Sequence, residues 1–131
     1  MYDPLRRKNV PDTPEEFVRQ WFIKWLIDDK GYSVLRMSSE YSFSYNRLSY
    51  RADIVVFGKQ LEPLLLVECK APSVKIDKSV VEQGLRYNRV LSVKFMIFTN
   101  GNSHYLCKRN KDTGFFESVK EVPSYQELLD S

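Results

Sequence analysis

The sequence contains little cysteine and little histidine, with two cysteines and one histidine among 131 residues. Cys69 and Cys107 are too few for a disulfide framework, and with one histidine they cannot complete a usual structural zinc site. The single histidine, His104, argues against a nucleophilic mechanism that depends on histidine, so we expect it to be structural. These absences favour a cytoplasmic protein with reduced thiols, whose chemistry depends on other side chains.

Long apolar segments are also absent. The apolar run from Leu64 to Val67 has only four residues, whereas a membrane-spanning helix needs about 20. The N-terminus is polar and basic and lacks the apolar core of a signal peptide, so we expect neither secretion nor membrane insertion. A net charge of +3 permits an anionic partner without requiring one.

A length of 131 residues predicts one domain over residues 1–131. Residues 1–11 are expected to form a basic N-terminal arm, because Arg6, Arg7 and Lys8 are adjacent and the prolines of this segment exclude a long helix. Two interpretations of the arm remain open: a solvated tail, or a segment that contacts phosphate groups.

Two apolar segments in the middle of the chain, Ile54–Phe57 and Leu64–Val67, are typical of β-strands joined by a turn. Charged residues stand where these strands begin and end. Asp53 precedes the first strand, and Glu68 and Lys70 follow the second. An otherwise apolar hairpin therefore carries its charge at one end.

The register of this hairpin decides whether the two acids meet. If residues 58–63 form the loop, Phe57 pairs with Leu64, and Asp53 then lies directly opposite Glu68. Residues in this relation have Cβ atoms about 5 Å apart, and like charges there are destabilising. Two such carboxylates need a compensating cation, which a lysine and a bound divalent metal would supply.

Alternation along the second strand places Glu68 and Lys70 on one face and Cys69 on the other, where it is expected to be a small core residue. Mg²⁺ prefers oxygen ligands and is commonly held by one or two carboxylates. Asp53 and Glu68, helped by the backbone carbonyl of Cys69, therefore form a candidate metal site. Lys70 could orient the attacking water and offset negative charge in the transition state.

Two long helices are predicted on either side of the hairpin in sequence. The first is capped by Thr13 and ends at Gly31. The second spans Ile76–Ser92 and is capped at or near Asp77 or Ser79. Because a helix links two strands, the connection implies a parallel crossover, so we expect an α/β fold with a mixed β-sheet flanked by helices.

On the first helix, Val18, Phe22 and Trp25 form a predicted buried stripe with Glu15 at one end. Trp21 is also interpreted as core, with a surface for a partner helix as the alternative. For Glu15 and its neighbour Glu16, interaction with the helix dipole is the alternative to a role in the site.

The second helix carries Gln83 and Tyr87 four residues apart and therefore on one face, where they could meet a phosphodiester or hold Lys70 in place. Basic residues in and just before this helix are candidate contacts to a DNA backbone: Lys75, Lys78, Arg86 and Arg89. A solvated helix face is the alternative. The remaining predicted elements are strands at 34–37, 41–45, 94–98, 104–108 and 115–119, a turn at 46–47 and a short helix at 124–129.

Taken in order along the chain, these positions resemble the PD-(D/E)xK nuclease superfamily: Glu15, Asp53, Glu68-Cys-Lys70 and Gln83-x-x-x-Tyr87. The chain is more closely similar to the N-terminal nuclease domain of type I restriction enzyme R subunits. That similarity rests on five segments: Pro14–Gln20, Arg51–Phe57, Leu66–Pro72, Gln83–Asn88 and Phe98–Gly101.

The resemblance implies a restriction-endonuclease-like core in the order αβββαβ and DNA cleavage that depends on Mg²⁺, which Mn²⁺ can replace. It assigns the catalytic set to Asp53, Glu68 and Lys70. It also favours Glu15, four residues before Arg19, over the adjacent glutamate, and it relates Gln83 and Tyr87 to a motif of RecB-type nucleases.

Three departures from the family pattern are visible. Ala52 stands where the superfamily has its proline, no phosphate-binding loop is present, and 131 residues leave no room for the ATP-driven translocase of R subunits. We therefore expect no ATP use by this chain.

The sequence thus predicts a small Mg²⁺-dependent DNA endonuclease. A single site cuts one strand, so duplex cleavage would need a homodimer or separate restriction-system subunits. Two alternatives remain open: a structure-selective nuclease resembling junction resolvases, and a non-catalytic DNA-binding or assembly module with a relic site.

Overall fold

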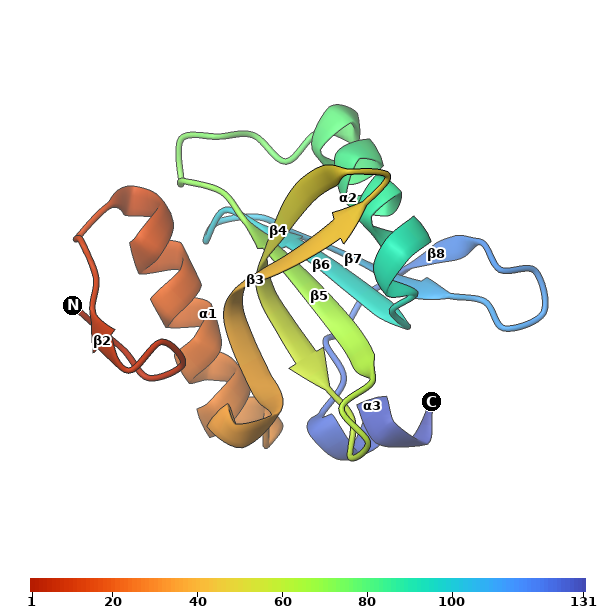
Figure 1. The fold of residues 1–131 in the computed structure, drawn as a ribbon, viewed down its shortest axis with the longest axis horizontal. Helices are drawn as coiled ribbons and strands as arrows, with labels where there is room; N and C mark the ends of the chain where they lie inside the picture. The colour runs from red at the N-terminus through yellow and green to blue at the C-terminus, as the bar shows by residue number, and fades with distance from the viewer.

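A computed structural model of the chain describes residues 1–131, apart from the side chains of Tyr45 and of residues 87–91. The helices are α1 (Pro14–Lys30), the 3-10 helix η1 (Val34–Arg36), α2 (Lys78–Leu91) and α3 (Tyr125–Asp130). The strands are β1 (Tyr2–Asp3), β2 (Lys8–Asn9), β3 (Met37–Tyr45), β4 (Leu48–Phe57), β5 (Pro63–Cys69), β6 (Phe95–Thr99), β7 (His104–Arg109) and β8 (Phe116–Val119) (Figure 1). Among the described residues, no helix is long and apolar enough to pass through a membrane.

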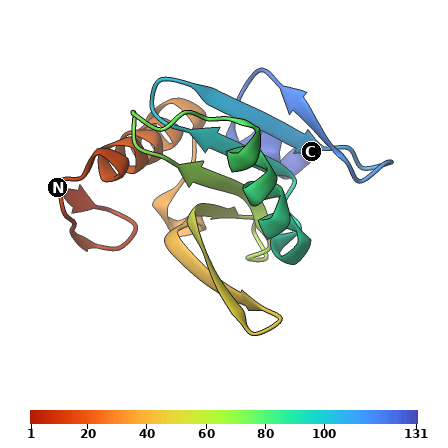
Figure 2. The ribbon, with the colours of Figure 1, turned by 90° about the horizontal axis from the view of Figure 1, so that it is seen from above.

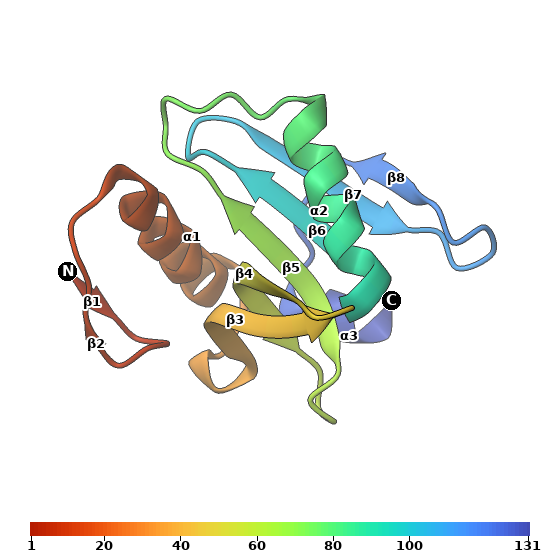
Figure 3. The same ribbon diagram turned by 45° about the horizontal axis from the view of Figure 1, so that its top comes forward.

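Strands β3 to β8 form one sheet in which spatial neighbours are also neighbours in sequence. Adjacent strands are antiparallel except for β5 and β6, which are parallel and are connected through α2. Helix α2 lies over one face of the sheet (Figure 3). The predicted mixed sheet with flanking helices and a parallel crossover is therefore confirmed.

Each face of the sheet carries a hydrophobic core. In the α1-side core, Phe22 and Leu128, from α1 and α3, pack with strand residues such as Ile97. In the α2-side core, α2 packs against a cluster that includes Leu66 and Phe98. The sheet is therefore covered on both faces, as parallel pairing within a sheet generally requires.

Helix α2 lies close to the sheet at a glycine. A Cβ atom at Gly84 would lie 2.2 Å from Cε1 of Phe98, and Gly84 itself is buried. Helical spacing predicts a buried line through Val80 or Val81, Leu85 and then residue 90 or 91, but Val80, Val81 and Leu85 are only half-buried. The positions predicted to continue that line, 90 and 91, lie outside the described side chains.

Helix α1 begins and ends as predicted. The Thr13 hydroxyl accepts a hydrogen bond from the Glu16 N–H at 3.1 Å, and Gly31 adopts a left-handed φ of 75° at the other end. The prediction that Trp21 belongs to the core is wrong, because its side chain is 48% exposed. The buried face follows the i, i+3, i+4, i+7 spacing of residues 19, 22, 23 and 26, which excludes Trp21 and leaves Trp25 half-buried.

The strand predicted at 34–37 is wrong, because residues 34–36 form η1. The Ser33 hydroxyl accepts a hydrogen bond from the Leu35 N–H at 3.2 Å and so begins this turn. One long strand, β3, follows and continues through the segment predicted as a separate strand at 41–45. Asn46 and Arg47, both with positive φ, then form the predicted turn at the tip of the β3–β4 hairpin, which projects from the sheet (Figure 2).

The register predicted for the β4–β5 hairpin is confirmed over most of its length, with Ile54 paired to Val67 and two further pairs in the same frame. At the turn the prediction is wrong, because Phe57 pairs with Pro63 rather than with Leu64. An irregularity between residues 56 and 57 shifts the register by one residue there. The end of the hairpin that carries the acids keeps the predicted frame.

Candidate metal site at the end of the central strands

Asp53 and Glu68 are the next two residues in line after the Ile54–Val67 pair, so the strands bring them side by side. Both oxygens of Asp53 are bound within the protein. Oδ2 accepts a hydrogen bond from the Cys69 N–H at 2.6 Å, and Oδ1 accepts one from Nη2 of Arg19 at 3.1 Å. The first acid is therefore held both by the neighbouring strand and by α1.

Strand β4 changes direction at Asp53. Ala52 belongs to the α2-side core and Ile54 to the α1-side core, although residues two apart on a regular strand share a face. On β3 the residue opposite Asp53 is Glu40, which lies between two regular pairs and has a left-handed φ of 53°. This local distortion accompanies the approach of the Asp53 carboxylate to α1.

Two arginines, the buried Arg19 and the partly buried Arg6, connect four carboxylates next to this bend, and we call this group the arginine cluster. Arg19 donates to Glu16 at 3.4 Å and to Glu40 at 3.1 Å in addition to Asp53. Arg6 donates to Glu40 at 2.9 Å and also to Asp3 and Glu16. The members of the cluster are Asp3, Arg6, Glu16, Arg19, Glu40 and Asp53.

The N-terminal segment reaches this cluster through a hairpin. Residues predicted to form a basic arm instead contain the paired strands β1 and β2, which lie beside α1 (Figure 1). Arg6, whose side chain is only 14% exposed, points into the cluster, whereas Arg7 and Lys8 are exposed. Of these three basic residues, Arg6 thus forms ion pairs inside the protein.

Glu68 is in an unusual environment for a carboxylate. Its Oε1 atom is buried and has no hydrogen-bond partner among the described residues. Burial, and then the adjacent negative charge of Asp53, raises the pKa of Glu68 to about 8. Burial also raises the pKa of Asp53, although the Cys69 N–H and the Arg19 guanidinium oppose this shift. Two neighbouring acids that are both costly to ionise favour a cation between them.

The two glutamates at the start of α1 differ in environment. Glu16 is buried in the arginine cluster. The side chain of Glu15 is 47% exposed, lies 3.6 Å from Nη2 of Arg19, and its charge contributes to the raised pKa of Glu68. Glu15 is therefore the glutamate that faces the acidic pair.

Lys70 lies at the same end of the sheet. Its backbone N–H donates to the Thr99 carbonyl at 2.8 Å, which continues the pairing of β5 with β6 beyond Cys69. Its positive charge opposes the rise in the pKa of both Asp53 and Glu68. Its ammonium group forms no ion pair with any described residue. Cys69 lies in the α1-side core, which confirms that it faces away from Glu68 and Lys70.

Of the α2 residues predicted for the site, Gln83 is not in contact with it. Gln83 is exposed and forms no hydrogen bond with the acids or Lys70 among the described residues. Tyr87 and Arg89 lie outside the described side chains. Lys75, Lys78 and Arg86 are exposed, and Lys78 pairs with Glu82 at 3.8 Å, so a role of these residues in DNA contact stays a prediction.

Within the described part of the chain, no three side chains from His, Cys, Asp and Glu converge closely enough to hold a metal ion. Asp53 and Glu68 would therefore need a backbone carbonyl, waters or Glu15 to complete a coordination shell. Arg6 and Glu40 are not predictable as neighbours of the site from the sequence, because no local pattern connects residues 34 positions apart. The sequence shows only that basic residues cluster near the N-terminus.

Fold and site together define a mixed α/β domain with an acidic pair and a lysine at the end of its central strands. The chain belongs to the family described as the type I restriction enzyme R protein N terminus, whose model matches residues 14–123. Over 51 residues it is 43% identical to the type I restriction enzyme EcoAI endonuclease subunit of Escherichia coli, and this match covers 39% of the chain and 6% of that protein.

The fold is shared with a solved structure. A fragment assigned to the HsdR subunit of a type I restriction enzyme from Vibrio vulnificus superposes with a TM-score of 0.63 over 88% of this chain and 24% of that one, at 18% identity. The chain thus spans a small part of the length of both relatives. The predicted similarity to the N-terminal domain of R subunits is confirmed.

Proposed function

We propose that this domain is a metal-dependent DNA endonuclease of the PD-(D/E)xK type, with a restriction-endonuclease-like core formed by α1, β3, β4, β5, α2 and β6. The proposal is carried by one observation: a buried carboxylate oxygen on Glu68, beside Asp53, that has no hydrogen-bond partner in the described part of the chain. A buried carboxylate oxygen without a partner destabilises the fold, and a catalytic or metal-binding role is one explanation for such a group. Family membership supports the same reaction class.

The donor set fits a hard divalent cation. Mg²⁺ is commonly held by one or two carboxylates and several waters, and Asp53 and Glu68 supply the carboxylates. The backbone carbonyl of Cys69 and the half-exposed carboxylate of Glu15 would be further oxygen ligands. When bound, Mg²⁺ or Mn²⁺ supplies Lewis-acid stabilisation of the phosphate and a more acidic water.

The protein's own residues contribute charge and orientation. The ammonium group of Lys70 would position the attacking water and offset negative charge on the scissile phosphate. Arg19 keeps the Asp53 carboxylate in a fixed orientation through its bond to Oδ1. Gln83 and Tyr87 would act from α2 only if the substrate bridges the distance between that helix and the acidic pair.

A cleavage assay tests this function. Linear, branched and single-stranded DNA are incubated with wild type, Lys70→Ala and Lys59→Ala, in Mg²⁺ or in EDTA. Lys59 is an exposed lysine in the β4–β5 turn, at the opposite end of the strands, and is the matched control. We expect cleavage only with metal, its loss in Lys70→Ala and its retention in Lys59→Ala. Equal cutting by all three proteins would exclude the assigned site.

A second candidate function, a non-catalytic DNA-binding module, is favoured by the hydrogen bonds that the Asp53 carboxylate already accepts. Both of its oxygens already accept hydrogen bonds, from Arg19 and from the Cys69 N–H. In that case DNA binding would survive Asp53→Ala, and no DNA form would be cut in either Mg²⁺ or Mn²⁺.

The whole reaction in the cell would involve more than this domain. The relatives are far longer than the matched segment, so we propose that target choice and any movement along DNA come from other segments or subunits of a restriction system. One site cuts one strand, and duplex cleavage would then need a homodimer or such a partner. Preference for branched DNA would point instead to an enzyme resembling junction resolvases.

A further inference from the structure

A concave site begins at the same end of the sheet as the acidic pair. It is a cavity of about 470 Å³ between α1, the start of β7 and the segment before α3, within the size range of small-ligand sites. The residues used in the argument below are Trp21, Phe22, Trp25, Lys30, His104 and Lys120, all of which line it. None of them has a role in the proposed cleavage reaction.

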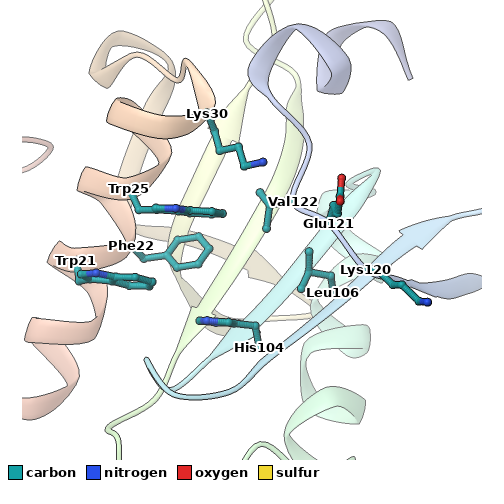
Figure 4. Close-up of a pocket in the computed structure, with 9 residues that line it drawn as sticks. All are labelled: Trp21, Phe22, Trp25, Lys30, His104, Leu106, Lys120, Glu121 and Val122. Carbon is teal, nitrogen blue, oxygen red and sulfur yellow. The ribbon is translucent and has the colours of Figure 1, made fainter.

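Three aromatic rings in this cavity are nearly parallel. The ring planes of Trp21 and Trp25 differ by 9° with centroids 6.3 Å apart, and those of Trp21 and His104 differ by 10° with centroids 6.1 Å apart. Figure 4 shows all three rings edge-on, with Phe22 between the levels of the two indoles. A flat ligand that enters the cavity would therefore stack on rings that already share its orientation.

The cavity is open on its aromatic side. Trp21 is 48% exposed, so its ring is accessible to a ligand from solvent. His104 is also exposed and is held in place by its Nδ1 atom, 2.7 Å from the Thr99 hydroxyl. Partial burial lowers the pKa of His104, which favours the neutral form of the ring.

Positive charge stands next to the rings. The Lys30 ammonium lies 5.5 Å from the Trp25 ring centroid and points toward the cavity, whereas that of Lys120 points outward from the rim (Figure 4). Glu121 is the acidic residue of the lining. A flat aromatic ligand that carries negative charge is complementary to this combination, and a nucleotide has both properties.

The cavity begins at the same end of the sheet as the acidic pair, where Cys69, Thr99 and His104 are cross-strand neighbours. Thr99 links the cavity to Lys70, because its carbonyl accepts the Lys70 N–H at 2.8 Å and its hydroxyl contacts His104. The backbones of Cys69 and His104, both paired with Thr99, are about two strand spacings apart, roughly 10 Å, or about three nucleotide rises of ~3.4 Å. Glu68 and Lys70 project from the face of the sheet opposite to Cys69, so a DNA strand that passes round this end of the sheet could present a base to the cavity.

We propose that this cavity binds an unpaired base of a DNA strand, stacked parallel to Trp21 and His104, a few nucleotides from the acidic pair. The inference rests on the proposed function for the identity of the ligand as DNA. Stacking on aromatic side chains beside a basic residue is a general mode of single-strand binding. It makes single-stranded or frayed DNA the preferred ligand of the domain.

The two tryptophans of the chain both line the cavity, so intrinsic fluorescence reports on it directly. Wild type is titrated in EDTA with oligothymidylate and with an abasic oligomer of equal length and charge. We expect saturable quenching by oligothymidylate and little by the abasic oligomer. Equal quenching by both oligomers, or none by either, would overturn the inference.

Variants test the same point with a labelled oligothymidylate. Trp21→Ala should weaken binding about tenfold or more, Trp21→Phe should retain most of the affinity, and Phe115→Ala, an exposed aromatic outside the cavity, should have no effect. Unchanged affinity in Trp21→Ala contradicts base stacking.

Because binding is measured in EDTA, the two proposals can fail separately. Base-dependent quenching without cleavage in Mg²⁺ would refute only the endonuclease proposal. Cleavage without base-dependent quenching would refute only this one.

Discussion

Arg19 binds Asp53 across 34 positions of sequence, through a hydrogen bond of 3.1 Å from Nη2 to Oδ1. Its other terminal nitrogen, Nη1, bonds Glu40 at 3.1 Å. The guanidinium fork therefore joins the acid of the candidate metal site to the distorted position on β3. Loss of Arg19 would leave three buried or half-buried carboxylates with less compensation.

The first prediction concerns this arginine. Arg19→Ala should lower the free energy of unfolding by about 3–5 kcal/mol, because removal of one partner leaves uncompensated buried charge. Urea denaturation followed by circular dichroism measures the change. The control is Lys24→Ala, which removes a cation that is 81% exposed and should cost no more than about 0.5 kcal/mol. A similar small effect for both variants would mean that the arginine cluster is not stabilising.

The second prediction concerns the pH dependence of stability without metal. The pKa of Glu68, about 8, lies above the ordinary value of 4.5, so the folded protein binds this proton more tightly than the unfolded chain. The stability that it contributes is full below pH ~4.5 and is lost as the pH rises to ~8. In EDTA, the free energy of unfolding should fall over this window by an amount on the order of a few kcal/mol.

Glu68→Gln tests the assignment of that slope. The amide does not titrate, so the variant should show a smaller decrease in stability, with the remainder partly due to Asp53, whose pKa is also raised. Denaturant titrations at several pH values between 5 and 8 provide the comparison. Parallel curves for wild type and variant would show that Glu68 ionises normally.

The third prediction concerns the contact between α2 and the sheet. In an exposed helix, a glycine-to-alanine change stabilises by up to about 1 kcal/mol. At Gly84 the added Cβ would meet the Phe98 ring at 2.2 Å, so Gly84→Ala should instead destabilise by about 1–3 kcal/mol. Thermal or urea unfolding decides the sign.

A double-mutant cycle distinguishes this clash from a general effect on the helix. Phe98→Leu removes the ring, and adding Gly84→Ala to it should cost less than in the wild type. Additive effects of the two changes would place the cause elsewhere in α2.

Sequence patterns were sufficient where the forces are local. The Thr13 cap, the Gly31 end and the frame that aligns Ile54 with Val67 all follow from neighbouring residues and strand alternation. The same patterns failed at residues 34–37, where a hydrogen bond from Leu35 N–H to the Ser33 hydroxyl favours a helical turn. They also failed at Trp21, because helical periodicity does not say which neighbouring line of side chains will meet the sheet.

The sequence by itself determined that two acids and a lysine would come together at the end of a hairpin, because residues 53 to 70 are close in the chain and alternation orients them. Only the tertiary structure decided how those acids are held. The N-terminal hairpin, α1 and β3 converge on Asp53 from separate parts of the chain and supply Arg6, Arg19 and Glu40. Such contacts depend on the path of the whole chain, which local propensity and periodicity do not encode.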